Sequence, residues 1–336
     1  MRAAVLSLFI ALGATSGTSG ASAPTRSAAI AAACEPPLKV AFKVVGVGSM
    51  NVGVWYPTTD AETDVDYAKN VKGHARKDGA IDGCARFPLV VFSHGFSGCG
   101  TQVVYLTEEL ARRGYIVAAP DHRDALCSVT GKGSFHSIKT DQSFFEPNKW
   151  DERTHVDRRD DLERTIDWML GSSELKSAIA PGKIGLVGHS LGGYDVLGLA
   201  GGWESWTDRR VGAVVAMSPY ATPFMAKNRM RAIRVPVMYQ GAQWDIGITP
   251  YLRGDKGAFG LSNAPKYYVE LKLGGHFEWT NLPCGSDRVS RCLSSKSNPR
   301  LIDEYAIAFL DRYLKEDATA LSRLDGKGLA AYRTQN

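Results

Sequence analysis

The sequence predicts a single α/β domain in which helices cover both faces of a mostly parallel central sheet. Short, continuously apolar runs alternate along the chain with segments of helical periodicity, a pattern typical of strand–helix–strand units. The apolar runs indicate strands that are buried on both faces, as in parallel sheets. The chain has 336 residues, of which 44% are hydrophobic and 10% aromatic, so it is long enough to bury a large core.

Each predicted element follows from its local pattern. The run FPLVVFSHG at 87–95 is continuously apolar and ends at His-Gly, which indicates a buried strand. Leu162, Ile166 and Met169 lie near one face of a predicted helix at 158–171. Further strands are predicted at 38–57 (two strands), 115–124, 183–188, 211–219, 235–241 and 266–274, helices at 107–115, 191–200 and 299–314, and loops at 59–87 and 125–150.

The N-terminus indicates export. Met1 and Arg2 precede a short apolar segment, AAVLSLFIALGA, and a small-residue site at 21–23, a pattern typical of a secretory signal peptide. We predict a signal peptide at 1–23 with cleavage between 21 and 33, a folded domain at 34–315 and a polar tail at 316–336; a lipid anchor on Cys34 is the alternative. No stretch is long enough to span a bilayer, so a secreted or periplasmic protein without a transmembrane segment is expected.

The six cysteines all lie beyond the predicted signal peptide. An even number of cysteines in an exported chain suggests three disulfides. Cys284 and Cys292 are close in sequence and are expected to pair. Of the other pairings that six cysteines allow, we predict Cys34–Cys84 and Cys99–Cys127. The spacing fits no CxxC pattern, so no metal site is predicted.

The charge pattern excludes one class of partner. Lys and Arg together number 40 against 35 Asp and Glu, which gives a net charge of +5, and no long basic run is present. Because phosphate backbones are bound by clustered Lys and Arg, no nucleic-acid partner is expected. The sequence does not indicate an oligomeric state.

The segment KIGLVGHSLGGYDVLGLA contains the pattern Gly-x-Ser-x-Gly where a predicted strand meets a predicted helix. This context is that of a nucleophile elbow, a tight turn that exposes a serine, here Ser190. Gly188 and Gly192 leave room for the crossing of strand and helix. The amides of Leu191, directly after the serine, and of Phe96, in the loop after the strand at 87–95, are the predicted donors to an oxyanion.

Chain order selects the partners of Ser190. In enzymes built on such an elbow, the acid and then the histidine follow the serine. Of the seven histidines only His276, in LKLGGHFEWTN, lies beyond Ser190, and we predict that it is the base. Asp245 lies within four residues of the predicted strand VPVMYQG and is the predicted acid, which would orient the imidazole and stabilise the imidazolium. Asp255 is the alternative.

Four motifs, PLVVFSHGFSG, GYIVAAPDHRD, GHSLGG and GGHFEWTN, together resemble one branch of the α/β hydrolases. This branch contains secreted platelet-activating-factor acetylhydrolases, dienelactone-hydrolase-like proteins and cutinase-like polyester hydrolases. The resemblance covers roughly residues 38–315 and implies an α/β-hydrolase catalytic domain. The chain departs from dienelactone hydrolases in its serine nucleophile. Plasma-type acetylhydrolases carry their acid after the preceding strand, where this chain has MSPYATPF and no carboxylate. The position of Asp245 therefore looks more like the cutinase-like arrangement.

Residues outside the predicted Ser190, Asp245 and His276 set are assigned to substrate contacts or to structural roles. The resemblance to the cutinase-like group implies that Tyr220 lines the substrate cleft, and Trp244 is a second predicted substrate contact. His122 and Asp124, in DHRD, are either a second catalytic pair or, as we predict, residues that hydrogen-bond loops. The charged segment RTHVDRRDDLER at 153–164 is predicted to be a solvated helix face.

These observations predict a secreted serine hydrolase that cleaves carboxylic esters through an acyl-enzyme and needs no metal or organic cofactor. The expected substrate is a small-molecule or polymeric ester, of short-acyl, lipid or polyester type. A serine peptidase of the same fold and a non-catalytic binding protein on a hydrolase scaffold are the alternatives.

Overall fold

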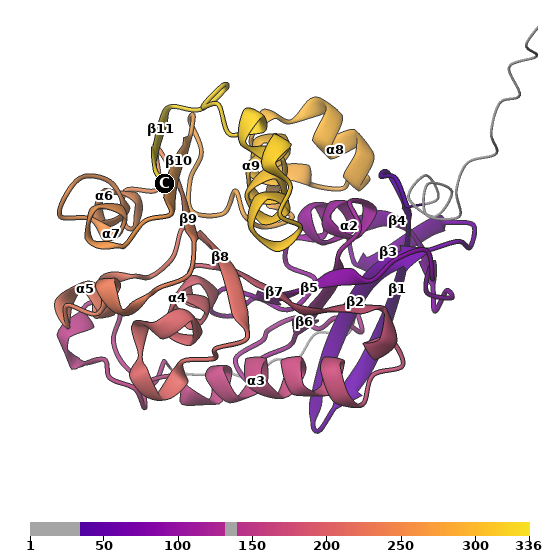
Figure 1. The fold of residues 1–336 in the computed structure, drawn as a ribbon, viewed down its shortest axis with the longest axis horizontal. Helices are drawn as coiled ribbons and strands as arrows, with labels where there is room; N and C mark the ends of the chain where they lie inside the picture. Colours follow the sequence, from indigo (N-terminus) through magenta and orange to yellow (C-terminus); the bar gives the residue numbers. More distant parts are fainter. Residues whose placement is uncertain (1–33, 132–139) are drawn as a thin grey trace, which may run out of the picture.

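A computed structural model describes residues 34–131 and 140–336, which form one mixed sheet with helices on both faces, as predicted (Figure 1). The predicted signal peptide and its cleavage region lie outside the described residues. The strand order is β11-β10-β9-β8-β7-β5-β6-β2-β1-β4-β3. The strands from β10 to β6 are parallel to one another. Antiparallel pairing with β11 at one end and with β2 at the other extends this parallel part of the sheet.

The bounds of the elements agree with most of the predicted segments. The strands are β1 (Lys39–Val47), β2 (Met50–Thr58), β3 (Thr63–Ala68), β4 (Val71–Lys77), β5 (Phe87–Ser93), β6 (Ile116–Pro120), β7 (Ile179–His189), β8 (Val211–Met217), β9 (Val237–Ala242), β10 (Lys266–Leu271) and β11 (Ala331–Gln335). The α-helices are α2 (Val104–Arg112), α3 (Val156–Gly171), α4 (Leu191–Leu197), α5 (Thr222–Ala226), α6 (Thr249–Leu252), α7 (Ala258–Leu261), α8 (Val289–Ser295) and α9 (Ser297–Leu314).

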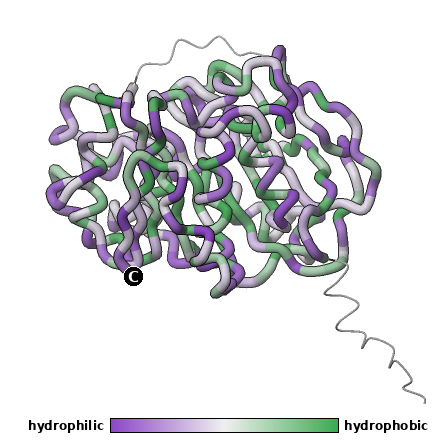
Figure 2. Tube along the Cα trace, turned by 90° about the horizontal axis from the view of Figure 1, so that it is seen from above, coloured by the Kyte–Doolittle hydropathy of each residue, from purple (hydrophilic) through white to green (hydrophobic). Residues whose placement is uncertain are grey.

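The central strands are apolar along their whole length because helices bury both of their faces. Every residue of β5 and β6 is buried. Helices α3 and α4 pack on one face of the sheet, and α2 and α9 pack on the other (Figure 1). Figure 2 shows the hydrophobic segments of the chain concentrated in the interior and the hydrophilic segments around them. The parallel arrangement brings the carboxyl ends of β5, β7, β8, β9 and β10 to one edge, where the loops of the site lie.

Two predicted segments differ from the structure. The predicted loop at 59–87 contains the hairpin β3–β4, which pairs with β1. The predicted polar tail contains β11, which pairs antiparallel with β10. Both β3 and β11 are edge strands, and an edge strand has little apolar periodicity when much of its surface faces solvent. In β3, for example, Asp64 and Asp66 are exposed.

Three disulfides join the same pairs of cysteines that were predicted. They are Cys34–Cys84, Cys99–Cys127 and Cys284–Cys292, with Cα atoms 5.6, 5.3 and 5.1 Å apart. The bridge between Cys99 and Cys127 connects the loop after β5 to the loop after β6. No helix in the described part of the chain is long and apolar enough to cross a membrane.

Candidate active site

Ser190 stands on a sharp turn between the end of β7 and the start of α4. Its φ of +56° and ψ of −114° form a strained conformation for a residue other than glycine. The turn is tight because two glycines allow close approach. A Cβ on Gly192 would lie 2.1 Å from the carbonyl oxygen of Ser93, and one on Gly188 would lie 2.2 Å from the carbonyl oxygen of Gly192. The local geometry is therefore that of a nucleophile elbow.

The structure brings Ser190, His276 and Asp245 together at the carboxyl edge of the sheet. The His276 Nε2 atom lies 2.9 Å from the Ser190 Oγ atom. The Nδ1 atom of the same ring lies 3.3 Å from the carboxylate of Asp245, which is buried in the loop after β9. The alternative acid, Asp255, lies elsewhere: its side chain is 94% exposed and accepts a hydrogen bond of 3.2 Å from Arg333. The arrangement can move a proton from the hydroxyl to the imidazole.

Ser218 is a member of this site that the sequence analysis missed. It lies directly after β8, and its Oγ atom is 2.9 Å from His276 Nδ1 and donates a hydrogen bond to Asp245. The imidazole therefore has a serine hydroxyl as well as a carboxylate on its Nδ1 side. Ser218 opens the sequence SPYATPF, the stretch noted above for its lack of a carboxylate.

The backbone of His276 is held by His189, the residue before Ser190. His189 Nε2 donates to the carbonyl oxygen of His276 at 2.9 Å, and Gln102 Nε2 donates to His189 Nδ1 at 2.8 Å. Complete burial, together with repulsion between the His189 and His276 rings when both are protonated, lowers the pKa of His189 well below its ordinary value. The ring is therefore neutral and uses one nitrogen as donor and the other as acceptor.

The loop after β5 leaves one of its amides available to an oxyanion. The N–H groups on either side of Phe96 are bonded: Gly95 to Gln102 Oε1 at 2.9 Å, Ser97 to Asp124 Oδ2 at 3.1 Å and Gly98 to the Gly95 carbonyl at 2.9 Å. Within residues 34–131 and 140–336, the Phe96 N–H has no such acceptor. Leu191 is the first residue of α4, so its N–H has no partner within that helix.

The prediction of a solvated helix face at 153–164 is wrong for its central residues. Arg158 is completely buried and Asp161 nearly so, on the face of α3 that packs against the sheet. The guanidinium forms ion pairs with Asp195 at 3.0 Å and Asp124 at 3.5 Å. Burial raises the pKa of Asp195 to about 7, although Arg158 opposes this shift. A buried arginine is the partner that buried carboxylates require.

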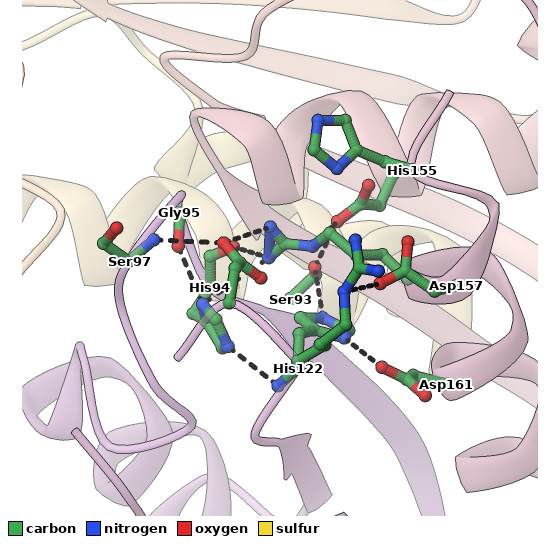
Figure 3. Close-up of polar contacts among 12 residues, drawn as sticks. Ser93, His94, Gly95, Ser97, His122, His155, Asp157 and Asp161 are labelled. Carbon is green, nitrogen blue, oxygen red and sulfur yellow. Dashed lines mark hydrogen bonds and ion pairs between the residues drawn. The ribbon is translucent and has the colours of Figure 1, made fainter. Parts of the chain in front are cut away.

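His122 also belongs to this cluster and lies apart from the Ser190–His276 pair. Its Nδ1 atom is 3.0 Å from Asp161 Oδ2, and its Nε2 atom is 3.0 Å from Ser93 Oγ (Figure 3). Ser93 in turn donates to Asp195 at 2.8 Å. Because Asp124 bonds the amide of Ser97, the DHRD motif makes the loop contacts that were expected of it.

The two predicted substrate contacts differ in exposure. Tyr220 is only 6% exposed, and its hydroxyl donates to the carbonyl oxygen of Phe144 at 2.6 Å. Trp244, beside Asp245, is 63% exposed. Phe277, beside His276, is 61% exposed. Exposed aromatic surface therefore adjoins Asp245 and His276 in sequence.

One group of side chains has ligand atoms close enough for a cation. Asp141, His155 and Asp157 present such atoms within 4.8 Å of one another. The guanidinium of Arg123 lies 3.1 Å from each of the two carboxylates, so a positive charge is already present there.

Comparisons with known proteins show similarity to acetylhydrolases and to cutinases. The family model described as platelet-activating factor acetylhydrolase, isoform II, matches residues 60–160. The chain is 22% identical to a platelet-activating factor acetylhydrolase of Cavia porcellus over 74% of this chain and 62% of that protein, so it spans less than two thirds of that relative. It is 24% identical to Cutinase 2 of Thermobifida cellulosilytica over 69% of this chain and 70% of the cutinase.

A solved structure shares the fold. A ferulic acid esterase from Streptomyces cinnamoneus superposes with a TM-score of 0.62 at 21% sequence identity, covering 83% of this chain and 91% of the esterase. The predicted resemblance to the acetylhydrolase and cutinase-like branch, and the predicted α/β-hydrolase fold, are thus confirmed.

Proposed function

We propose that this chain, an α/β hydrolase that resembles the acetylhydrolase and cutinase-like branch, is a secreted serine hydrolase of carboxylic esters. The observation that carries the proposal is the 2.9 Å contact between Ser190 Oγ and His276 Nε2. Ester hydrolysis is also what the names of the relatives have in common. The three disulfides support export, because such bonds persist in oxidising compartments.

In the proposed mechanism Ser190 Oγ attacks the acyl carbon while His276 Nε2 takes its proton. The amides of Phe96 and Leu191 donate to the oxyanion that forms on the carbonyl oxygen. His276 then returns the proton to the leaving alcohol, and an acyl-enzyme remains. Water, deprotonated by His276, attacks the acyl carbon of this acyl-enzyme; His276 then returns the proton to the Ser190 oxygen as the acyl–oxygen bond breaks, which releases the acid and free Ser190. While the ring is positively charged, its Nδ1–H donates to Asp245 and to Ser218. The Ser218 hydroxyl donates in turn to Asp245.

Apolar surface beside the site supports an ester with an apolar acyl or aryl part. Trp244 and Phe277 flank Asp245 and His276 in sequence and expose more than half of their surface. An extended substrate could cover this surface on binding and so remove it from water. Among carboxylic esters we therefore expect the rate of hydrolysis to rise at first as the apolar area of the acyl group increases, and then to fall for larger acyl groups.

The purified protein tests this function directly. Turnover of p-nitrophenyl butyrate is expected, and a chromogenic peptide should not be cleaved. A series of acyl-chain lengths, one phospholipid and one polyester film would then define the substrate. Cleavage of the peptide without ester turnover would favour the peptidase alternative. If neither substrate is turned over and a fluorophosphonate probe does not react, the binding-protein alternative is correct.

Replacing Ser218 with alanine is expected to lower kcat for p-nitrophenyl butyrate by about 10-fold, because one hydrogen bond to the charged imidazole is lost. KM should change little, since Ser218 lies behind the imidazole. Asp245 remains 3.3 Å from the ring, so the loss should be smaller than for Asp245→Asn. An unchanged kcat would show that the Ser218 contact has no part in the reaction. The buried Ser173→Ala is a suitable control for the loss of a hydroxyl.

A further inference from the structure

The direction of the Phe96 N–H is set by the carbonyl group on the other side of the same peptide bond. In a trans peptide the C=O and N–H point in opposite directions, so a fixed Gly95 carbonyl fixes the Phe96 amide. That carbonyl accepts two hydrogen bonds, from His94 Nδ1 at 2.7 Å and from the Gly98 N–H at 2.9 Å. Figure 3 shows the His94 ring lying alongside the Gly95 carbonyl.

The His94 ring is itself held at its second nitrogen. Its Nε2 atom accepts a hydrogen bond of 3.0 Å from the backbone N–H of His122, in the DHRD motif. This pattern requires a neutral ring with its proton on Nδ1. Burial, together with the charges of Arg158 and His122, lowers the pKa of His94 well below its ordinary value, which agrees with a neutral ring. Both nitrogens of a completely buried histidine are thus used to join two loops.

The buried arginine holds the same loop from the other side. Arg158 donates to the carbonyl oxygen of His94. It also pairs with Asp124, which accepts the Ser97 N–H at 3.1 Å. Burial opposes ionisation of Asp124 most strongly, but Arg158, the two nearby histidines and the Ser97 N–H together outweigh it, and the pKa of this carboxyl falls below its ordinary value. The backbone is therefore bonded on both sides of Phe96 by His94, Asp124 and Arg158, whose side chains, within the described residues, form no hydrogen bond or ion pair with Ser190 or His276.

We propose that His94 is a positioning residue of the oxyanion hole, which directs the Phe96 N–H by holding the Gly95 carbonyl, and that Arg158 and Asp124 fix the loop around it. This inference rests on the proposed function, since it assigns the Phe96 amide to the oxyanion. It also gives the buried charges of α3 and the DHRD motif a role in the rate of the reaction.

Two substitutions of His94 separate positioning from folding. His94→Leu removes both hydrogen bonds at similar volume, whereas His94→Asn places an N–H close to the position of Nδ1. Loss of an oxyanion donor lowers the rate by roughly 10²–10³-fold. Because His94→Leu keeps the Phe96 N–H but leaves it misdirected, it should lower kcat by about 10–100-fold with little change in KM. His94→Asn should recover most of this loss. The affinity for a trifluoromethyl ketone, whose hemiketal oxyanion binds the same amides, should fall in parallel.

Glu108→Leu is the matched control. Glu108 is completely buried on α2 and accepts hydrogen bonds from the Tyr67 hydroxyl at 2.6 Å and the His74 N–H at 3.0 Å. This variant should lose stability but keep the kcat of the natural chain. If His94→Leu loses only stability and keeps kcat within two-fold, as Glu108→Leu is expected to, the positioning role is wrong. If the natural chain itself turns over no ester, the proposed function fails instead. If His94→Leu does not fold, a normal ketone affinity of His94→Ala or His94→Gln would overturn the inference.

Discussion

Ser190→Ala is expected to lower kcat for p-nitrophenyl butyrate by about 10⁶-fold, the order seen when the serine of a comparable triad is removed. In the proposed mechanism the Ser190 Oγ atom forms the bond to the acyl carbon, and it lies 2.9 Å from His276 Nε2. The fold should persist, because alanine removes one oxygen and leaves the backbone turn in place. Initial rates and active-site titration of the natural chain and the variant measure the effect.

Labelling by a fluorophosphonate probe is an independent readout of the same variant. The natural chain should be labelled once, and Ser190→Ala should not be labelled. Ser173→Ala, a change at another buried serine, should leave both labelling and turnover unchanged. Persistent labelling of Ser190→Ala would place the nucleophile elsewhere.

Asp245→Asn is expected to lower kcat by about 10⁴-fold, as for the acid of other serine triads. The amide nitrogen of asparagine would face His276 Nδ1, from which Asp245 is now 3.3 Å away. A ring that accepts at Nδ1 carries its proton on Nε2, and it then cannot take the proton of Ser190. The thermal midpoint of unfolding should be measured beside kcat to exclude loss of fold.

The second acidic candidate gives the matched control for this prediction. Asp255→Asn should change kcat less than two-fold, because the carboxylate is 94% exposed and pairs with Arg333. If Asp255→Asn loses activity and Asp245→Asn keeps it, the assignment of the acid is wrong. Equal small losses would indicate that Ser218 alone suffices to orient His276.

Strands of the sheet interior could be predicted because burial on both faces leaves a continuous apolar run. Strand β5 is one such run, and all seven of its residues are buried. The hairpin β3–β4 and the strand β11 could not be predicted in this way. They are stabilised by pairing with β1 and β10, which is a property of the folded sheet and not of their own composition.

In the site, too, residues marked by local motifs could be predicted, whereas residues that depend on contacts between distant segments could not. The meeting of Ser190 and His276 could be predicted because chain order and local motifs leave few candidates. Ser218 carries no local signature, and its role depends on the adjacency of the ends of β8 and β9. Its position at the end of the strand that follows Ser190 is its one cue in the sequence, and this cue gains meaning only beside the loop after β9. The burial of Arg158 could not be predicted because its neighbours in sequence are charged and only half-buried, whereas its carboxylate partners come from distant segments.

Mass spectrometry of the trapped enzyme tests the central claim most directly. The natural chain is incubated with a fluorophosphonate, digested and mapped, and His276→Asn is treated in the same way. We expect a single adduct on the peptide that contains Ser190, and its rate of formation should fall by several orders of magnitude in His276→Asn. An adduct on another residue, or ester turnover that continues with Ser190 unmodified, would contradict the account.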